Sequence, residues 1–167
     1  MGWEYSEKTK QLFMDAVQGK PGTKTVKGIE FTGTPCFHDR VKGKQRGPNT
    51  IYSFTLDGIS VCHLGDLGHP LDNAVIKSLG KIDVLFTPTG GPAATMELDE
   101  AAHLWDALKP ALIIPMHFKN DKCTFPKYTV KDLLALKPNA KQIGKNEVEL
   151  TAATLPKREI WILDHAL

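Results

Sequence analysis

Residues 50–64 read TIYSFTLDGISVCHL and hold the strongest structural signal in the chain. Two β-rich runs, Thr50–Leu56 and Ile59–Leu64, are separated only by the pair Asp57-Gly58. An Asp-Gly pair between two such runs favours a two-residue turn, because both residues tolerate positive φ. The stretch therefore predicts an antiparallel β-hairpin.

The residues before this hairpin predict a helix and a further strand. From Ser6 to Val17 apolar side chains recur at helical spacing, and Gly19 and Pro21 then end the pattern. A β-like run follows at 28–34. We expect residues 1–25 to form a helix and a lead-in, residues 26–167 to form the main body, and the whole chain 1–167 to be a single domain.

After the hairpin the pattern changes to alternating helices and strands, which is typical of α/β folds. Helices are expected at 71–79, 97–108 and 130–136, and strands at 83–87, 111–114, 147–152 and 159–163. The fold class is therefore α/β, with a mixed β-sheet and flanking helices.

Composition excludes several classes of function. A formal charge of +2, from 21 basic and 19 acidic residues, gives no field that would attract a polyanion, and the basic cluster Lys42, Lys44 and Arg46 lacks interleaved aromatic residues. We therefore expect no nucleic-acid partner. No apolar run approaches the roughly 20 residues needed to span a bilayer, so no membrane association is expected.

The cysteines and the first residues indicate the compartment. Cys36, Cys62 and Cys123 are scattered and include no CxxC pair, so neither a disulfide framework nor a zinc finger is predicted. The stretch from Met1 to Ser6 lacks the basic region followed by an apolar stretch that marks a secretory signal. Both features lead us to expect a cytoplasmic protein.

Three turns at expected strand ends carry metal-ligand residue types. His38 lies in Cys36–Asp39, Asp66 lies between His63 and His69, and His117 lies in Pro115–Phe118. Imidazole and carboxylate are natural zinc ligands, and α/β folds place their chemistry at strand ends. Each residue also has a structural interpretation: a single histidine is commonly hydrogen-bonded structure, and Asp66 could cap the next helix. We expect His63 and His69 to support the ligands without binding the metal or to be structural, and His103 and His165 to be structural.

In combination these segments resemble the metallo-β-lactamase superfamily, specifically the branch of metal-dependent hydrolases that includes the ascorbate-phosphate lactonase type. The matching segments are His38-Asp39 after a strand, His63–His69 after the hairpin, Pro88-Thr89-Gly90-Gly91, and Ile114-Pro115-Met116-His117. They occur in the family's order and cover most of the chain.

The resemblance implies a role for each matching residue. His38 would be the third histidine of a first metal site, Asp66 the catalytic carboxylate that bridges two ions, and His117 the last ligand of a second site. Thr89, Gly90 and Gly91 would line the cavity nearby. Two cations held by one carboxylate can polarise a shared water near neutral pH. Mixed histidine and carboxylate ligands suit zinc or manganese.

The family's His-x-His-x-Asp-His cluster does not occur in this sequence, whose first histidine is His38. Each ion would then have only two protein ligands, whereas catalytic zinc normally has three and a water. We expect the fold to resemble the C-terminal half of the αββα sandwich, with one sheet face left uncovered. Such a face would be met by a second copy of the chain, giving a homo-oligomer, or by a separate N-terminal half.

Three interpretations of function stay open. The first is a metal-dependent hydrolase of a small-molecule ester, lactone or phosphoester, incomplete in this chain. The second is a non-catalytic, truncated domain that acts as an oligomerising or binding module. The third is thiol chemistry at Cys36 or Cys62, which requires a lowered pKa and solvent access.

Overall fold

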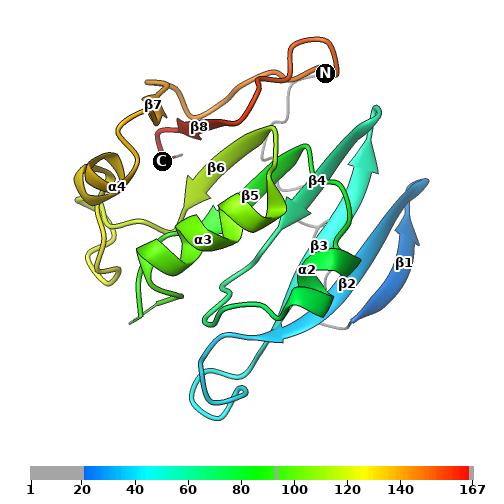
Figure 1. The fold of residues 1–167 in the computed structure, drawn as a ribbon, viewed down its shortest axis with the longest axis horizontal. Helices are drawn as coiled ribbons and strands as arrows, with labels where there is room; N and C mark the ends of the chain where they lie inside the picture. The colour runs from blue at the N-terminus through cyan, green and yellow to red at the C-terminus, as the bar shows by residue number, and fades with distance from the viewer. Residues whose placement is uncertain (1–20, 93, 166–167) are drawn as a thin grey trace.

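Residues 21–92 and 94–165 are described here from a computed structural model. In this part of the chain eight strands form one mixed sheet, in the order β1-β2-β3-β4-β5-β6-β8-β7 (Figure 1). The strands are β1 (Gly22–Val26), β2 (Ile29–Phe37), β3 (Pro48–Leu56), β4 (Ile59–His63), β5 (Val84–Pro88), β6 (Leu112–Met116), β7 (Lys141–Gln142) and β8 (Glu159–Ile162), and the helices are α2 (Asn73–Ser78), α3 (Leu98–Leu108) and α4 (Val130–Leu136). The α/β class with a mixed sheet is confirmed. The helix expected from Ser6 to Val17 lies outside the described residues.

The antiparallel half of the sheet contains the predicted hairpin. Strands β3 and β4 pair with Leu56 opposite Ile59, so the turn consists of Asp57 and Gly58 alone. Both residues have positive φ, 49° and 78°. These signs are those of a type I′ turn, whose twist matches that of the strands that it joins.

A second hairpin, between β1 and β2, was missed at the sequence level. It pairs Val26 with Ile29 across Lys27 and Gly28, whose φ values are 49° and 81°. Strand β1 contains Thr23, Lys24 and Thr25 and is largely exposed. It carries no apolar alternation because it forms the edge of the sheet, where polar residues prevent unwanted pairing.

The parallel half of the sheet is joined by helices that local sequence specifies well. Helix α3 starts with a capping box between Glu97 and Glu100, and α4 starts with one between Thr129 and Asp132. Each box satisfies backbone donors that the first helical turn leaves unpaired. Helix α4 has the predicted bounds, and α3 begins one residue later than predicted. No helix in the described ranges is long and apolar enough to span a bilayer.

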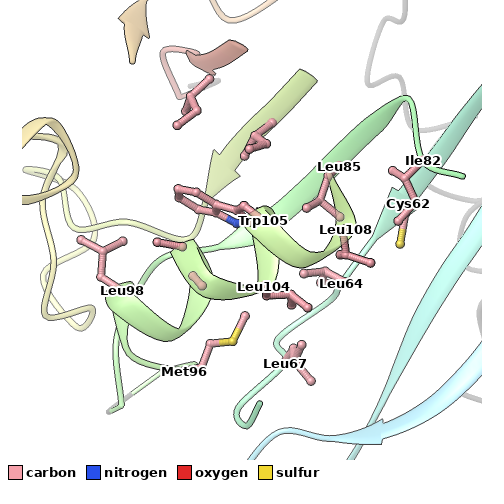
Figure 2. Packing of buried hydrophobic residues seen from close by; sticks show 14 of the residues in the cluster. Cys62, Leu64, Leu67, Ile82, Leu85, Met96, Leu98, Leu104, Trp105 and Leu108 are labelled. Carbon is pink, nitrogen blue, oxygen red and sulfur yellow. The ribbon is translucent and has the colours of Figure 1, made fainter. Parts of the chain in front are cut away.

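The main core lies between α3 and the sheet face that it covers. Trp105 projects from α3 toward the sheet and is 2% exposed, and the side chains around it come from α3 itself, from β4 and β5 and from the adjoining loops (Figure 2). Its indole Nε1 donates to Thr87 Oγ1 over 3.1 Å. The core extends to Leu64 and Leu67, both fully buried, which flank the turn after β4. That turn is therefore anchored on both sides.

The predicted strand at 147–152 was wrong. Residues 147–151 form no strand, and Thr151 to Thr154 form a turn in which the Thr154 amide donates to the Thr151 carbonyl over 3.0 Å. Leu150 and Leu155 instead pack against buried residues of the second sheet face, which are Ile59, Val84, Leu112 and Ile114. Leu150, which lies in the predicted strand, therefore covers the sheet rather than extends it. Part of the face expected to be open is thus covered within one chain.

Candidate metal centre

The candidate residues all follow strand ends on the same side of the sheet, where β2, β4 and β6 finish. Strands β4, β5 and β6 are mutually parallel, and β2 runs in the same direction because it and β4 both pair antiparallel with β3. His38 follows β2, Asp66 lies just beyond β4, and His117 follows β6. The arrowheads of β4 and β6 point toward this edge (Figure 1). The topology therefore brings together segments that are far apart in the sequence.

Asp66 and His117 are in direct proximity. His117 Nε2 lies 3.8 Å from Asp66 Oδ1, and the two side chains are 29% and 47% exposed. This separation is too long for a hydrogen bond, for which about 3.2 Å is the usual limit. Two donor atoms at 2.0–2.2 Å from one tetrahedral zinc ion are about 3.4 Å apart. The pair fits two ligands that face a shared cation better than it fits a hydrogen bond.

The backbone at His117 is unusual. Its φ is +58°, a left-handed conformation that few residues other than glycine adopt. Gly90 makes room for it, because an added Cβ at Gly90 would lie 2.6 Å from the His117 carbonyl oxygen and 3.0 Å from Nδ1. That Nδ1 atom is buried, with no hydrogen-bond partner in the described part of the chain. Close packing, rather than an acceptor, sets the orientation of this ring.

Thr89 and Gly91 have structural contacts around the same loop. Thr89 is 1% exposed, and both its amide and its hydroxyl donate to the Met116 carbonyl, over 2.9 and 3.1 Å. Gly91 has φ +87°, and an added Cβ would lie 2.9 Å from the Tyr128 ring. The loop after β5 is therefore tied to β6 on one side and packed against Tyr128 on the other.

A polar cluster beside this loop was missed at the sequence level. The Tyr128 hydroxyl donates to Glu97, and Lys127 Nζ lies 2.9 Å from that hydroxyl. The bond to Glu97 raises the pKa of Tyr128, and the bond to Tyr128 raises the pKa of Lys127. The lysine is thus charged and the tyrosine neutral at physiological pH. No sequence signal links these residues, because Glu97 precedes α3 and the others precede α4.

His38 reaches the same edge but faces a backbone carbonyl. Its Nε2 lies 2.6 Å from the Ala94 oxygen, and a carbonyl can only accept, so Nε2 carries the proton. Gly68 lies against the His38 backbone, where an added Cβ would come within 2.3 Å of the carbonyl oxygen. In this arrangement His38 does not offer the Nε2 lone pair to a cation.

The donor set fits a metal ion only in part. Asp66 and His117 face each other with suitable chemistry and spacing, whereas His38 is turned to Ala94. Within residues 21–92 and 94–165 no group of three or more His, Cys, Asp or Glu side chains is arranged to hold a metal ion. Asp66 and His117 are therefore the two candidate ligands that the fold brings together.

His63 and His69 have the expected structural roles. His63 Nδ1 accepts the Gly65 amide over 3.0 Å, and burial lowers the pKa of His63, with a partial offset from the charge of Asp66. His69 Nε2 accepts the Phe37 amide over 3.2 Å. The His63 ring thus binds the backbone of the turn that carries Asp66, and the His69 ring binds the end of β2.

The thiols do not fit nucleophilic chemistry. Burial raises the pKa of Cys36 to about 11 and that of Cys62 to about 12. A reactive cysteine needs a lowered pKa and solvent access. Neither buried thiol meets these conditions.

Comparison with known proteins shows the family of this chain. Residues 7–117 match the family described as the Beta-lactamase superfamily domain, which covers more than half of the chain. A metal-dependent hydrolase from Methanoculleus marisnigri is 35% identical over 130 residues, which are 72% of this chain and 56% of that protein. The chain belongs to the metallo-β-lactamase superfamily.

Other members of the metallo-β-lactamase superfamily extend the comparison. A metal-dependent hydrolase from Thermoplasma acidophilum is 31% identical over 118 residues, 70% of this chain and 52% of that protein. The crystal structure of a candidate Zn-dependent hydrolase of the superfamily from Thermotoga maritima superimposes with a TM-score of 0.73 at 36% identity, over 86% of this chain and 69% of that one. The chain spans about half the length of the curated relatives that it matches.

Proposed function

We propose that this chain is the C-terminal, ligand-bearing half of a metal-dependent hydrolase that cleaves a small-molecule ester, lactone or phosphoester. The observation that carries the proposal is the placement of His117 Nε2 3.8 Å from Asp66 Oδ1 at the carboxyl edge of parallel strands. The relatives are named metal-dependent hydrolases, which agrees with this assignment.

In this proposal Asp66 and His117 would hold a divalent cation, zinc or manganese, with Asp66 as the catalytic carboxylate. His38 would be a third ligand if its ring turned away from the Ala94 carbonyl. Such an ion supplies Lewis-acid chemistry, since it polarises the bond under attack and lowers the pKa of a coordinated water to about 7. The chain's own residues orient the site: Gly90 leaves room for His117, and Thr89 ties the loop that ends in Gly91 to β6.

The other ligands would come from outside the described residues. We propose a separate N-terminal half, the remainder of a longer protein, or a second copy of the chain in a homo-oligomer as their source. The relatives' greater length supports the first two. The three free cysteines agree with a cytoplasmic location, where thiols stay reduced.

A test of the metal site is zinc content by mass spectrometry after dialysis against a weak chelator. We expect weak, substoichiometric zinc in the wild type and less still in His117→Ala. His103→Ala removes an exposed histidine from α3 and serves as the matched control, which should retain zinc as the wild type does. Equal zinc in the two variants would contradict the assignment of His117.

A test of completeness is hydrolysis of a generic phosphodiester and a lactone by the purified chain with added zinc. We expect poor turnover, because two protein ligands leave most of the coordination sphere to water. Brisk turnover that is lost in His117→Ala would show instead that the chain is a complete enzyme.

A non-catalytic binding module is the second candidate. The bond from His38 to Ala94 favours it, because one of three expected ligands is engaged elsewhere. This candidate predicts no zinc retention in wild type or in any variant, and no gain of activity on adding an N-terminal half from a relative.

A further inference from the structure

Asn49, near the start of β3, makes three hydrogen bonds around the Asp66 turn. Its Nδ2 donates to the Leu64 carbonyl over 2.8 Å and to Cys36 Sγ over 3.0 Å. Its Oδ1 accepts the Asp66 amide over 3.1 Å. The side chain thereby links β2, β3 and the turn that carries the candidate metal ligand.

The chemistry of these partners requires an amide. The Leu64 carbonyl can only accept and the Asp66 N–H can only donate, so the asparagine needs a donor and an acceptor at fixed positions. A carboxylate at residue 49 would place an oxygen against the Leu64 carbonyl, and an apolar side chain would leave both groups unpaired.

The turn also closes tightly around this amide. An added Cβ at Gly65 would lie 2.4 Å from Asn49 Oδ1, and Gly65 has φ +59°. Leu64 and Leu67 are fully buried, whereas the Asp66 side chain is 47% exposed. The direction of the Asp66 carboxylate therefore depends on the backbone between the buried leucines, and Asn49 binds that backbone on both sides of Gly65.

We infer that Asn49 is a positioning residue, which holds Asp66 at the distance from His117 that a shared cation requires. This inference rests on the proposed function. Groups that orient metal ligands without touching the ion typically change metal affinity 10–100-fold, roughly, when they are removed.

The test compares Asn49→Ala with Asp83→Asn. Asp83 is a buried carboxylate just before β5, at the end of the strand opposite to the candidate site. It accepts the Ser60 amide over 2.9 Å. Its substitution weakens a buried contact far from the site and so controls for general loss of stability. Three quantities are measured for each protein: zinc affinity by competition with a chromophoric chelator, the melting temperature without metal, and the Asp66 to His117 separation in a metal-free crystal structure.

We expect Asn49→Ala to bind zinc about 10- to 100-fold more weakly and to lengthen the 3.8 Å separation. Asp83→Asn should lower the melting temperature but keep the zinc affinity and the Asp66 to His117 separation of the wild type. Wild-type affinity and separation in Asn49→Ala would overturn the inference. So would an equal loss of affinity in Asp83→Asn, because the effect would then follow stability alone.

Two provisions keep the test decisive. If Asn49→Ala does not fold, the near-isosteric Asn49→Asp replaces it, and the metal-free separation is again expected to lengthen; an unchanged separation overturns the inference. If wild-type protein binds no zinc, the proposed function fails, whereas the metal-free separation in the Asn49 variants still decides the role of Asn49.

Discussion

His117 Nε2 and Asp66 Oδ1 lie 3.8 Å apart although strand β5 runs between the strands that precede them. Strands two positions apart in a sheet are separated by about 9.5 Å, so the two side chains must reach over the end of β5. Two local devices make this possible: the glycine turn at Gly65 and the left-handed backbone of His117. Glycine adopts such a φ readily, so of these two positions only His117 has a backbone conformation that costs energy.

Strain at His117 leads to the first prediction, a comparison of His117→Gly with His117→Ala. At φ +58° a side chain with a Cβ is disfavoured by roughly 1–2 kcal/mol, and glycine is not. We expect His117→Gly to be more stable than His117→Ala by about 1 kcal/mol in urea denaturation, although both lose zinc. If alanine were equally stable at this position, the backbone there would not be strained.

Gly90→Ala should disturb the site by steric contact. The added Cβ would meet the His117 carbonyl oxygen at 2.6 Å and Nδ1 at 3.0 Å. We expect a loss of about 1–3 kcal/mol in unfolding free energy, together with weaker zinc binding, because the ring must move.

Gly80→Ala is the matched control for that change. Gly80 has φ +67° and nothing within 4 Å of an added Cβ, so this variant carries backbone strain without a contact. It should lose about 1 kcal/mol in urea denaturation and keep wild-type zinc affinity. Zinc binding that falls equally in both variants would show that the contact at Gly90 is unimportant.

Asp39 should make the chain sensitive to acid. Its carboxylate is 6% exposed and accepts four backbone amides, from Val41, Gly43, Gln45 and Arg46. Burial alone would raise the pKa of Asp39, but the four bonds outweigh burial and lower it below 3.8. The stability from Asp39 is therefore fully present above its unfolded pKa and is lost as the pH falls through the lower, folded value.

Asp39→Asn removes this contribution. We expect lower stability than wild type in urea at pH 7, and a difference that begins to shrink below about pH 4, where Asp39 of the unfolded chain takes up a proton, and shrinks further as the pH approaches the lower, folded pKa. Asp121→Asn, at an exposed position, should match the wild type at both pH values. A constant difference between Asp39→Asn and wild type from pH 7 to pH 3 would contradict this account.

Thiol labelling should single out one cysteine. Cys123 is exposed, whereas Cys36 and Cys62 are buried with pKa values of about 11 and about 12. At pH 8 the buried thiols are almost wholly neutral and unreactive. A chromogenic disulfide reagent should therefore label one thiol quickly in native wild type, none in Cys123→Ser, and all cysteines in denaturant. Fast labelling of native Cys123→Ser would reopen the thiol interpretation.

Sequence alone determined the features that depend on neighbouring residues. The turn at Asp57-Gly58 needs only two residues that tolerate positive φ, and α4 begins where Thr129 and Asp132 can cap each other. The order of the four strand-end segments also identified the superfamily and the edge of the sheet that carries His38, Asp66 and His117. The turn and the helix cap are each specified within a few residues of chain, whereas the superfamily is indicated by the order of short segments along it.

The tertiary structure alone decided features that depend on distant residues. Leu150 lies in a run that predicted a strand, but in the fold it packs, with Leu155, against the buried second face of the sheet. His38 has the position of a ligand, but Ala94 offers it a carbonyl. In the sequence Asn49 is an ordinary polar residue of a strand. Only the fold places the Leu64 carbonyl and the Asp66 amide against its side chain. Local conformation is set by short-range sterics and hydrogen bonds, whereas burial and polar pairing depend on which segments the sheet brings together.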